Sequence, residues 1–389
     1  PIDLVTVSWK LANDSKLDDV WGNAFLAELT NTVPTSSHVY EYAQIIKTKS
    51  VLRKLIRSGN DIIAMGYDEG EEINNLLEKA EQSLFWVTQT FIKNKLTHIR
   101  EVLSDRYEEY AETHDDPDAV DAARVKTWFK SLDGKLQWLR PGDMAILAAR
   151  PSMWKTSLGL NIAQNIAKKK SVAFFSLEMS KEQLVDRLVC AAMWIDSWKL
   201  QKGELTDEEF WRIGQALSDL SESKIYIDDS PGMNMLEIKS KARRLKMESD
   251  LDIIIIDYLQ LIHGNNPLNR VQEISEISRN IKSLARELWV PIIAMSQLSR
   301  AVESRATKEP ILSDLRESWS IEQDADIVMM IYREEYYQQD LPENDMNKWG
   351  TTIFIRKNRN GPVWSVDLAF DGKYMKFREI DTPVSYTHL

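Results

Sequence analysis

Residues 144–157 read MAILAARPSMWKTS, and this stretch decides the fold. Its first six residues are continuously apolar, as in a parallel strand that is covered on both faces. The rest has the spacing of the Walker A motif G-x-x-x-x-G-K-[ST], in which a loop between a strand and a helix binds phosphate. Lys155 and Thr156 close the motif, whereas Ala149 and Trp154 stand at its two glycine positions. The stretch predicts a nucleotide-binding α/β domain with an indole where the loop needs glycine.

The loop residues also predict the cofactors, ATP and Mg²⁺. Lys155 would give a positive charge to the β- and γ-phosphates, and Thr156 a hydroxyl to the metal. The second glycine of the motif lets backbone N–H groups approach a phosphate closely, so the indole of Trp154 should obstruct the cradle. The nucleotide would contact the whole loop: Ala149, Arg150, Pro151, Ser152, Met153, Trp154, Lys155, Thr156 and Ser157.

Outward from this loop, residues 126–380 alternate between strand-like and helix-like segments. The alternation predicts a doubly wound α/β ATPase domain, and the last strands could form an antiparallel edge. Residues 1–95 have the i, i+3, i+4 apolar pattern of helices, and residues 96–125 combine a charged helix with an acidic linker. Nine segments are predicted as strands: MAILAA, SVAFFSLEM, KIYIDD, DIIIIDYLQLI, PIIAMSQL, DIVMMIYR, TTIFIRKN, SVDLAF and KYMKF.

Polar side chains are predicted to meet at the carboxyl ends of these strands. Asp257 ends the run DIIIID and would hold Mg²⁺ through water, as a Walker B carboxylate. Glu178 follows the strand VAFFS and could take a proton from the attacking water, and Gln297 ends IIAMSQ and could sense the γ-phosphate. Each residue alone also fits an ordinary strand end or helix cap. The Walker A motif in the same domain favours the catalytic interpretation.

Two basic segments follow in the sequence. The loop SRAVESRATKEPILSDLRES carries Arg300, Arg305 and Arg316, as a loop that follows DNA phosphates would need. Lys357 and Arg359 lie two residues apart at a strand end, and a neighbouring subunit of a ring could project them at the γ-phosphate as an arginine finger. A solvated surface loop and an exposed basic hairpin are equally compatible with these residues alone.

The composition limits the class of protein. Lys and Arg number 49 against 60 Asp and Glu, a net charge of −11, which argues against a protein that coats nucleic acid with its whole surface. No apolar run reaches about 18 residues, so we expect no membrane span. The single cysteine, Cys190, lies in an apolar run, and the five histidines are scattered. We therefore expect a reducing, cytoplasmic location and no structural metal.

The order of the motifs resembles a known family. The chain resembles the DnaB-type replicative DNA helicases in ARPSMWKTSLGLNIA, FFSLEMSKEQLVDRL, IDDSPGM, IIIIDYLQL, SQLSRAVESR, LSDLRESWSIEQDADIVMMIYR and KNRNGP. The resemblance runs through essentially the whole chain. It implies a RecA-like ATPase domain behind a helical N-terminal domain, assembled as a homohexameric ring that moves on single-stranded DNA and unwinds forked DNA. It also implies primase and a helicase loader as partners.

The resemblance further implies roles for individual residues. The catalytic set would be Lys155, Thr156, Glu178, Asp257 and Gln297, with Lys357 and Arg359 acting on the neighbouring subunit's nucleotide. Thr156 and Asp257 would hold the metal. The DNA contacts would come from Arg300, Arg305, Arg316, Glu317 and Ser318. In this view residues 1–95 are an N-terminally truncated all-helical domain, and the tail 381–389 is non-native.

Tryptophan stands where the family usually has glycine. The chain has 13 tryptophans and only 14 glycines. One substitution repeated at cap and turn positions predicts a gene that reads UGA as glycine, translated with a code that reads UGA as tryptophan. Residue 154 would then be glycine and the ATPase intact, and Trp211 a genuine tryptophan inside a helix. The glycine-type positions are Trp21, Trp128, Trp138, Trp154, Trp194, Trp319 and Trp364, with Trp289 and Trp349 as further candidates.

Three alternatives stay open at this point. A RecA-fold recombination or repair ATPase shares the Walker motifs but lacks the helical N-terminal domain and linker helix. A catalytically dead ring subunit is favoured if Trp154 is genuine. A small-molecule kinase could use the same loop, although the sequence shows no acceptor pocket for it.

Overall fold

The computed structural model describes residues 39–67, 76, 79–80, 83, 98–116, 124–264, 269–315, 319–337 and 350–380. The chain divides into two compact units, Pro1–Glu108 and Glu109–Leu389. Helices are present where the sequence predicts them, α3 (Val39–Gly66) in the N-terminal region and α5 (Ile99–Asp115) in the linker. Most of the other predicted N-terminal helices, and the tail 381–389, lie outside the described residues. None of the helices in the described ranges is long and apolar enough to cross a membrane.

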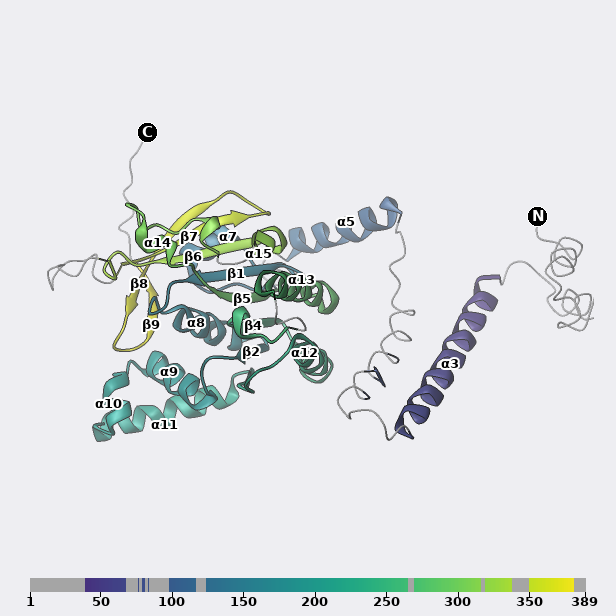
Figure 1. Ribbon diagram of the computed structural model, residues 1–389, viewed down its shortest axis with the longest axis horizontal. Helices are drawn as coiled ribbons and strands as arrows, with labels where there is room; N and C mark the ends of the chain where they lie inside the picture. The colour runs from purple at the N-terminus through teal and green to yellow at the C-terminus, as the bar shows by residue number, and fades with distance from the viewer. Residues whose placement is uncertain are drawn as a thin grey trace, which may run out of the picture. The chain divides into compact units, whose positions relative to one another are not determined.

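A nine-stranded sheet organises the second unit (Figure 1). Its order is β3-β2-β4-β5-β1-β6-β7-β8-β9, with parallel pairing from β3 to β6 and antiparallel pairing from β6 to β9. All nine predicted strands and the antiparallel edge are confirmed. The strands are β1 (Met144–Ala149), β2 (Val172–Ser176), β3 (Ile225–Asp228), β4 (Ile253–Asp257), β5 (Ile292–Gln297), β6 (Ile327–Tyr332), β7 (Gly350–Asn358), β8 (Trp364–Asp371) and β9 (Lys376–Glu379).

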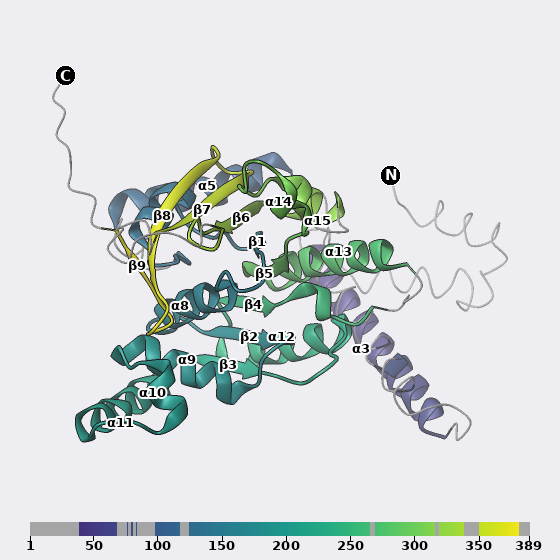
Figure 2. The same cartoon turned by 60° about the vertical axis from the view of Figure 1, so that its left-hand side comes forward.

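Helices cover both faces of the central parallel strands, which is why β1, β2, β4, β5 and β6 are almost entirely buried. Strand residues alternate between two buried clusters, one packed against α8 and α9 and the other against α12 and α13 (Figures 1 and 2). The described helices of this unit are α7 (Lys130–Leu136), α8 (Lys155–Ala167), α9 (Lys181–Met193), α10 (Ser197–Lys202), α11 (Asp207–Glu222), α12 (Met235–Ser249), α13 (Arg270–Leu288), α14 (Ala301–Ser304) and α15 (Trp319–Asp324), with the short 3₁₀ turns η3 (Leu259–Leu261) and η4 (Leu312–Asp314).

A glycine on α8 leaves room for the end of a side chain from β5. A Cβ on Gly159 would stand 1.9 Å from the Cε atom of Met295 on β5. Leu158 and Ile162 on the same helix are fully buried against the strands. This packing fixes the start of α8, and with it the phosphate loop, at the carboxyl edge of the parallel strands.

Four tryptophans adopt a backbone conformation that favours glycine. Their φ angles are 64° at Trp128, 60° at Trp154, 56° at Trp194 and 55° at Trp289. Trp154 is the N-cap of α8, and Trp194 and Trp289 are the C-caps of α9 and α13. The left-handed region costs an L-residue with a Cβ roughly 1–2 kcal/mol. Backbone geometry therefore supports the glycine interpretation at these four positions.

The other glycine-type positions differ. Trp138 and Trp364 are not among the described residues with positive φ. Trp364 begins β8, and Trp319, expected in a polar loop, is instead the first residue of α15. Helix and strand geometry accept any side chain, so the backbone gives no reason for glycine at 319 or 364. Trp21 and Trp349 lie outside the described residues.

Replacing Trp289 with glycine is expected to raise the free energy of unfolding by about 1 kcal/mol, because it removes left-handed strain at a side chain that is 69% exposed. Trp211 is 72% exposed inside α11 and is the matched control. Trp211→Gly should lower the same quantity by roughly 1 kcal/mol, since glycine weakens a helix interior. Urea unfolding of both variants measures whether each substitution raises or lowers the free energy of unfolding. Equal destabilisation by both would refute the glycine interpretation at residue 289.

Candidate active site

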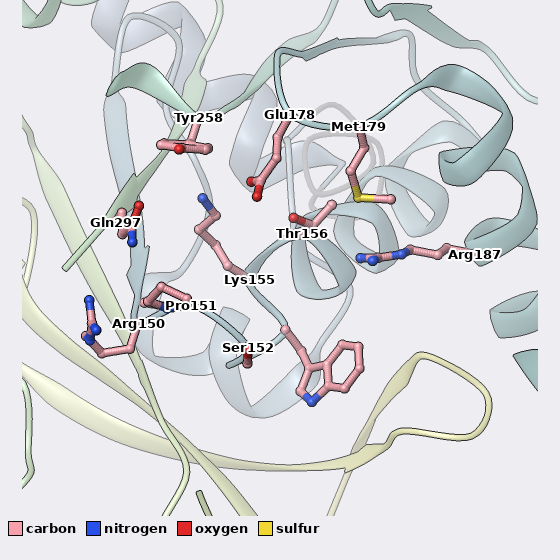
Figure 3. Close-up of a pocket in the computed structure, with 12 residues that line it drawn as sticks. Arg150, Pro151, Ser152, Lys155, Thr156, Glu178, Met179, Arg187, Tyr258 and Gln297 are labelled. Carbon is pink, nitrogen blue, oxygen red and sulfur yellow. The ribbon is translucent and has the colours of Figure 1, made fainter. Parts of the chain in front are cut away.

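A pocket of about 500 Å³ lies at the carboxyl edge of the parallel strands (Figure 3). It collects loop residues after β1 and β2 and the ends of β4 and β5. The lining residues are Ala149, Arg150, Pro151, Ser152, Trp154, Lys155, Thr156, Glu178, Met179, Arg187, Tyr258 and Gln297. Of the predicted loop, Met153 and Ser157 are buried and do not line it. The sequence prediction missed Met179, Arg187 and Tyr258.

Three predicted residues form the polar centre of the pocket. The Nζ atom of Lys155 lies 3.0 Å from Oδ1 of Asp257, a carboxylate with no exposed surface. The hydroxyl of Thr156 donates to Oδ2 of the same carboxylate at 2.5 Å. The ammonium group of Lys155 also lies 4.1 Å from the centre of the Tyr258 ring. The Walker A and Walker B residues are therefore in direct contact, as their place in the sequence predicts.

The oxygens of this centre fit Mg²⁺. Oδ1 of Asp257 is buried and accepts no hydrogen bond, although the Lys155 ammonium group is near it. Mg²⁺ prefers oxygen ligands and usually keeps only one or two from the protein, with phosphate and water completing the shell. The described ranges contain no cluster of three or more His, Cys, Asp or Glu residues that could hold a metal. Thr156 would supply its hydroxyl oxygen to the ion, and Asp257 would hold the ion through water.

Glu178 and Gln297 flank this centre from β2 and β5, the strands on either side of β4. Glu178 lies two residues after β2 and is exposed to the pocket, in a loop where the Ser176 hydroxyl donates to the carbonyl of Met179 at 2.6 Å. Gln297 ends β5, and its N–H donates to Oε1 of Gln260 at 3.3 Å. An exposed carboxylate can accept a proton from a water molecule bound between it and a phosphate. Gln260, which ties the end of β5 in place, was not predicted from the sequence.

Trp154 lines the pocket without filling it, contrary to the expected obstruction. Its indole stacks on Phe370 of β8, with ring centroids 5.1 Å apart and planes inclined by 30°. Phe370 is itself almost fully buried, so the indole is anchored to the core at the side of the loop. The backbone at residue 154 is still unfavourable for phosphate binding. A residue with a Cβ holds φ of 60° at the position where the loop must bring N–H groups close to a phosphate.

The side chain of Arg150 lines the pocket and is held by two partners on the segment that follows β5. Its guanidinium forms an ion pair with Glu303 of α14 at 2.8 Å and donates to the carbonyl of Leu298 at 2.8 Å. The side chain is 8% exposed. Arg150 therefore joins the phosphate loop to the segment that follows β5, which contains the predicted DNA contacts.

The predicted DNA contacts are only partly described. Arg300 is exposed and makes no ion pair within the described ranges. Arg305 pairs with Asp314, which neutralises its charge inside the same segment. Arg316, Glu317 and Ser318 lie outside the described residues. Among the described residues, Arg300 is thus the better placed of the two predicted arginines to contact a phosphate backbone.

Lys357 and Arg359 lie at the amino-terminal ends of the parallel strands, whereas the phosphate loop lies at their carboxyl ends. Lys357 is paired in register with Val328, which is paired with Ile146 near the start of β1, whereas the loop follows the end of β1. Arg359 contacts Asp326 at 3.1 Å, just before β6. Burial and the nearby Arg359 charge lower the pKa of Lys357. Neither side chain lines the pocket.

Family comparison agrees with this site. Residues 124–379 match the DnaB-like helicase C terminal domain, and residues 1–48 match the DnaB-like helicase N terminal domain. The chain belongs to the DnaB-like helicase family. It is 46% identical to the replicative DNA helicase DnaC of Bacillus subtilis (strain 168) and to the replicative DNA helicase DnaB of Geobacillus stearothermophilus, over 98% of this chain and 84% of each relative.

Solved structures agree as well. A DnaB-like replicative helicase, described with its interactions with primase, superposes with a TM-score of 0.73 at 32% identity, covering 98% of this chain and 88% of that one. A separately solved ATPase domain superposes with a TM-score of 0.68 at 36% identity, over 74% of this chain and all of that one. The DnaB-like chain is therefore an ATP-dependent replicative DNA helicase by family, which confirms the resemblance and sets aside the recombinase and small-molecule kinase alternatives.

Proposed function

We propose that this DnaB-like chain hydrolyses ATP at the interfaces of a homohexameric ring, and so moves along single-stranded DNA and unwinds a fork. The separation of two sets of residues carries the proposal. The pocket contains Lys155, Thr156 and Asp257 and lies at the carboxyl ends of the parallel strands. The other set, Lys357 and Arg359, lies at the amino-terminal ends. A finger that lies at the far edge of its own sheet can serve only the nucleotide of a neighbour.

Within the pocket, each residue has one task. The Lys155 ammonium group binds the β- and γ-phosphates, and the carboxylate of Glu178 takes the proton of the attacking water. Mg²⁺, held by Thr156 and Asp257, would neutralise phosphate charge when bound. Gln297, at the tip of β5, contacts the γ-phosphate and loses that contact after hydrolysis.

Loss of the γ-phosphate is transmitted to DNA through the segment after β5. The N–H of Leu298 donates to the carbonyl of Ala149 at 2.9 Å, so this segment is bonded directly to the start of the phosphate loop. The Arg150–Glu303 ion pair adds a second link. A change at either end therefore moves Arg300 and the residues that follow it.

Exposed apolar residues support assembly with other subunits. Helix α5 exposes Ile99, Leu103 and Tyr107, spaced four residues apart on one face, at 67%, 60% and 74%. Such a stripe on a helix is typical of a surface that packs against a partner. We propose that this face packs within the ring, and that primase and a loader bind the same assembly, as primase does in the helicase of similar structure.

Forked-duplex unwinding tests the proposal. The Trp154→Gly chain is expected to unwind a fork with a free single-stranded 5′ arm and to hydrolyse ATP faster when DNA is added, and both activities should disappear with EDTA or Lys155→Ala. Strand exchange without unwinding would indicate a recombinase instead. A ring that assembles but hydrolyses no ATP, even with glycine at 154, would show that the chain is a catalytically dead subunit.

A further inference from the structure

A buried aspartate holds the hairpin turn that carries Arg359. Asp326 directly precedes β6, and its backbone carbonyl accepts a hydrogen bond from the N–H of Arg359 at 2.9 Å. Its carboxylate oxygen Oδ1 accepts a hydrogen bond from Nη1 of the same arginine at 3.1 Å. The other terminal nitrogen of Arg359, Nη2, donates to the carbonyl of Gln323 in α15 at 2.6 Å. Both the backbone and the guanidinium of Arg359 are therefore held by their own subunit.

Asp326 is in turn anchored to the start of β1. Its second carboxylate oxygen, Oδ2, accepts hydrogen bonds from the N–H of Met144 at 2.8 Å and from the ammonium group of Lys282. The N–H of Asp326 donates to the carbonyl of Met144 at 2.9 Å. The residue is 5% exposed, so these contacts are shielded from water. Strand β1 thus carries the phosphate loop at one end and, through Asp326, holds the finger at the other.

This arrangement orients Arg359 and still leaves donors for a ligand. A guanidinium carries N–H groups on three nitrogens, and the bonds to Asp326 and Gln323 use one N–H on each terminal nitrogen. Among the described residues, no other group accepts a hydrogen bond from this side chain, which is 46% exposed. The Nε–H and the second N–H of each terminal nitrogen therefore remain for a phosphate outside the subunit.

We propose that Asp326 is the positioning residue for Arg359, and that it aligns the guanidinium for the terminal phosphate of ATP bound to the neighbouring subunit. The inference rests on the proposed function, because it assumes that Arg359 acts across a subunit interface. An arginine on a turn has many side-chain conformations, and fixing one of them in advance lowers the entropy cost of the catalytic contact. A misplacement of about 1 Å can cost about a hundredfold in rate.

Steady-state kinetics of the full chain with Trp154→Gly measure this alignment. Asp326→Asn should lower kcat for ATP hydrolysis about a hundredfold, because the guanidinium loses its charged partner. KM for ATP should change by less than about twofold, since a finger stabilises the charge of the transition state. Lys282→Met is the matched control, because it removes the other cation from the same carboxylate and leaves Oδ1 for Arg359. It should lower the melting temperature, yet change kcat by less than about twofold.

Rings assembled from two variants show in which subunit Asp326 acts. Equal amounts of Asp326→Asn and Lys155→Ala subunits, dissociated and reassembled together, should recover about a quarter of the turnover of the Trp154→Gly ring. About one interface in four then joins an intact pocket to an aligned finger. Asp326→Asn mixed with Arg359→Ala should recover nothing, since neither variant has a working finger. Asp326→Glu keeps the charge but moves the carboxylate by one methylene group, and it should give the same results in both mixtures.

The outcomes separate this inference from the proposed function. Three results would overturn the role of Asp326: a loss of turnover that Lys155→Ala subunits do not relieve, an equal loss of kcat in Lys282→Met, or a gain of kcat in Asp326→Asn. The gain would mean that Asp326 withholds the finger from the nucleotide. If Arg359→Ala mixed with Lys155→Ala also fails to recover turnover, the finger does not act across the interface and the proposed function itself fails.

Discussion

Replacing Trp154 with glycine is expected to raise ATP turnover at least about tenfold, the largest gain that one substitution should give. Glycine lets the loop N–H groups approach the phosphate. A hydrogen bond to a charged group contributes about 1.5–3 kcal/mol, and each 1.36 kcal/mol of transition-state stabilisation is about tenfold in rate. The left-handed strain at residue 154, with φ of 60°, acts on folding instead. The free energy of unfolding should change by less than about 1 kcal/mol, since the lost stacking on Phe370 offsets the relieved strain.

Trp138→Gly is the matched control for this experiment. Trp138 is not among the described residues with positive φ and does not line the pocket, and its ring packs under Arg124 at 3.9 Å. It should leave ATP turnover unchanged. Equal turnover with tryptophan and with glycine at position 154 would show that the loop tolerates the indole, as the stacking on Phe370 permits. Codons of the source gene give an independent check, with UGA expected at 128, 154, 194 and 289 and UGG at 211.

Much of the ATPase domain could be predicted from local sequence. Continuous apolar runs identified the early, parallel strands, because a strand covered on both faces has few polar positions. The later strands alternate more, as the half-exposed strands β7 and β8 do. The Lys155–Asp257 contact was also predictable, since the carboxyl ends of parallel strands meet at one edge. Positive φ at Trp194 was signalled by its place after a helical run.

Other features depend on contacts between distant segments. The direction of the Trp154 indole is set by Phe370, more than 200 residues later, and could not be read from the loop. Arg150 was placed with the nucleotide because of its position in the motif, yet Glu303 determines where its side chain lies. Arg187 occurs in a helical run whose pattern shows only that its neighbours are buried. Its orientation toward the pocket follows from the packing of α9.

Combining two inactive variants in one ring is expected to recover ATP turnover, and this is the second large effect. Lys155→Ala and Arg359→Ala, each with glycine at 154, should separately reduce ATP turnover about a thousandfold or more, as loss of an arginine finger does. Equal amounts dissociated and reassembled together should recover about a quarter of the unmutated turnover. In a head-to-tail ring, random mixing places an intact pocket beside an intact finger at about one interface in four.

ATP turnover can recover in the mixture only if Arg359 acts on the nucleotide of the neighbouring subunit. Arg359 is paired with Asp326 in its own subunit, so its removal could instead disturb the amino-terminal edge of the sheet. That structural effect would persist in every mutant subunit, and the mixture would then show only the average of the two inactive rings. Arg378→Ala, an exposed cation on β9, controls for loss of charge. A ring of Arg378→Ala subunits should keep full ATP turnover. A ring that mixes Arg378→Ala with Lys155→Ala subunits should show no more ATP turnover than its Arg378→Ala subunits supply.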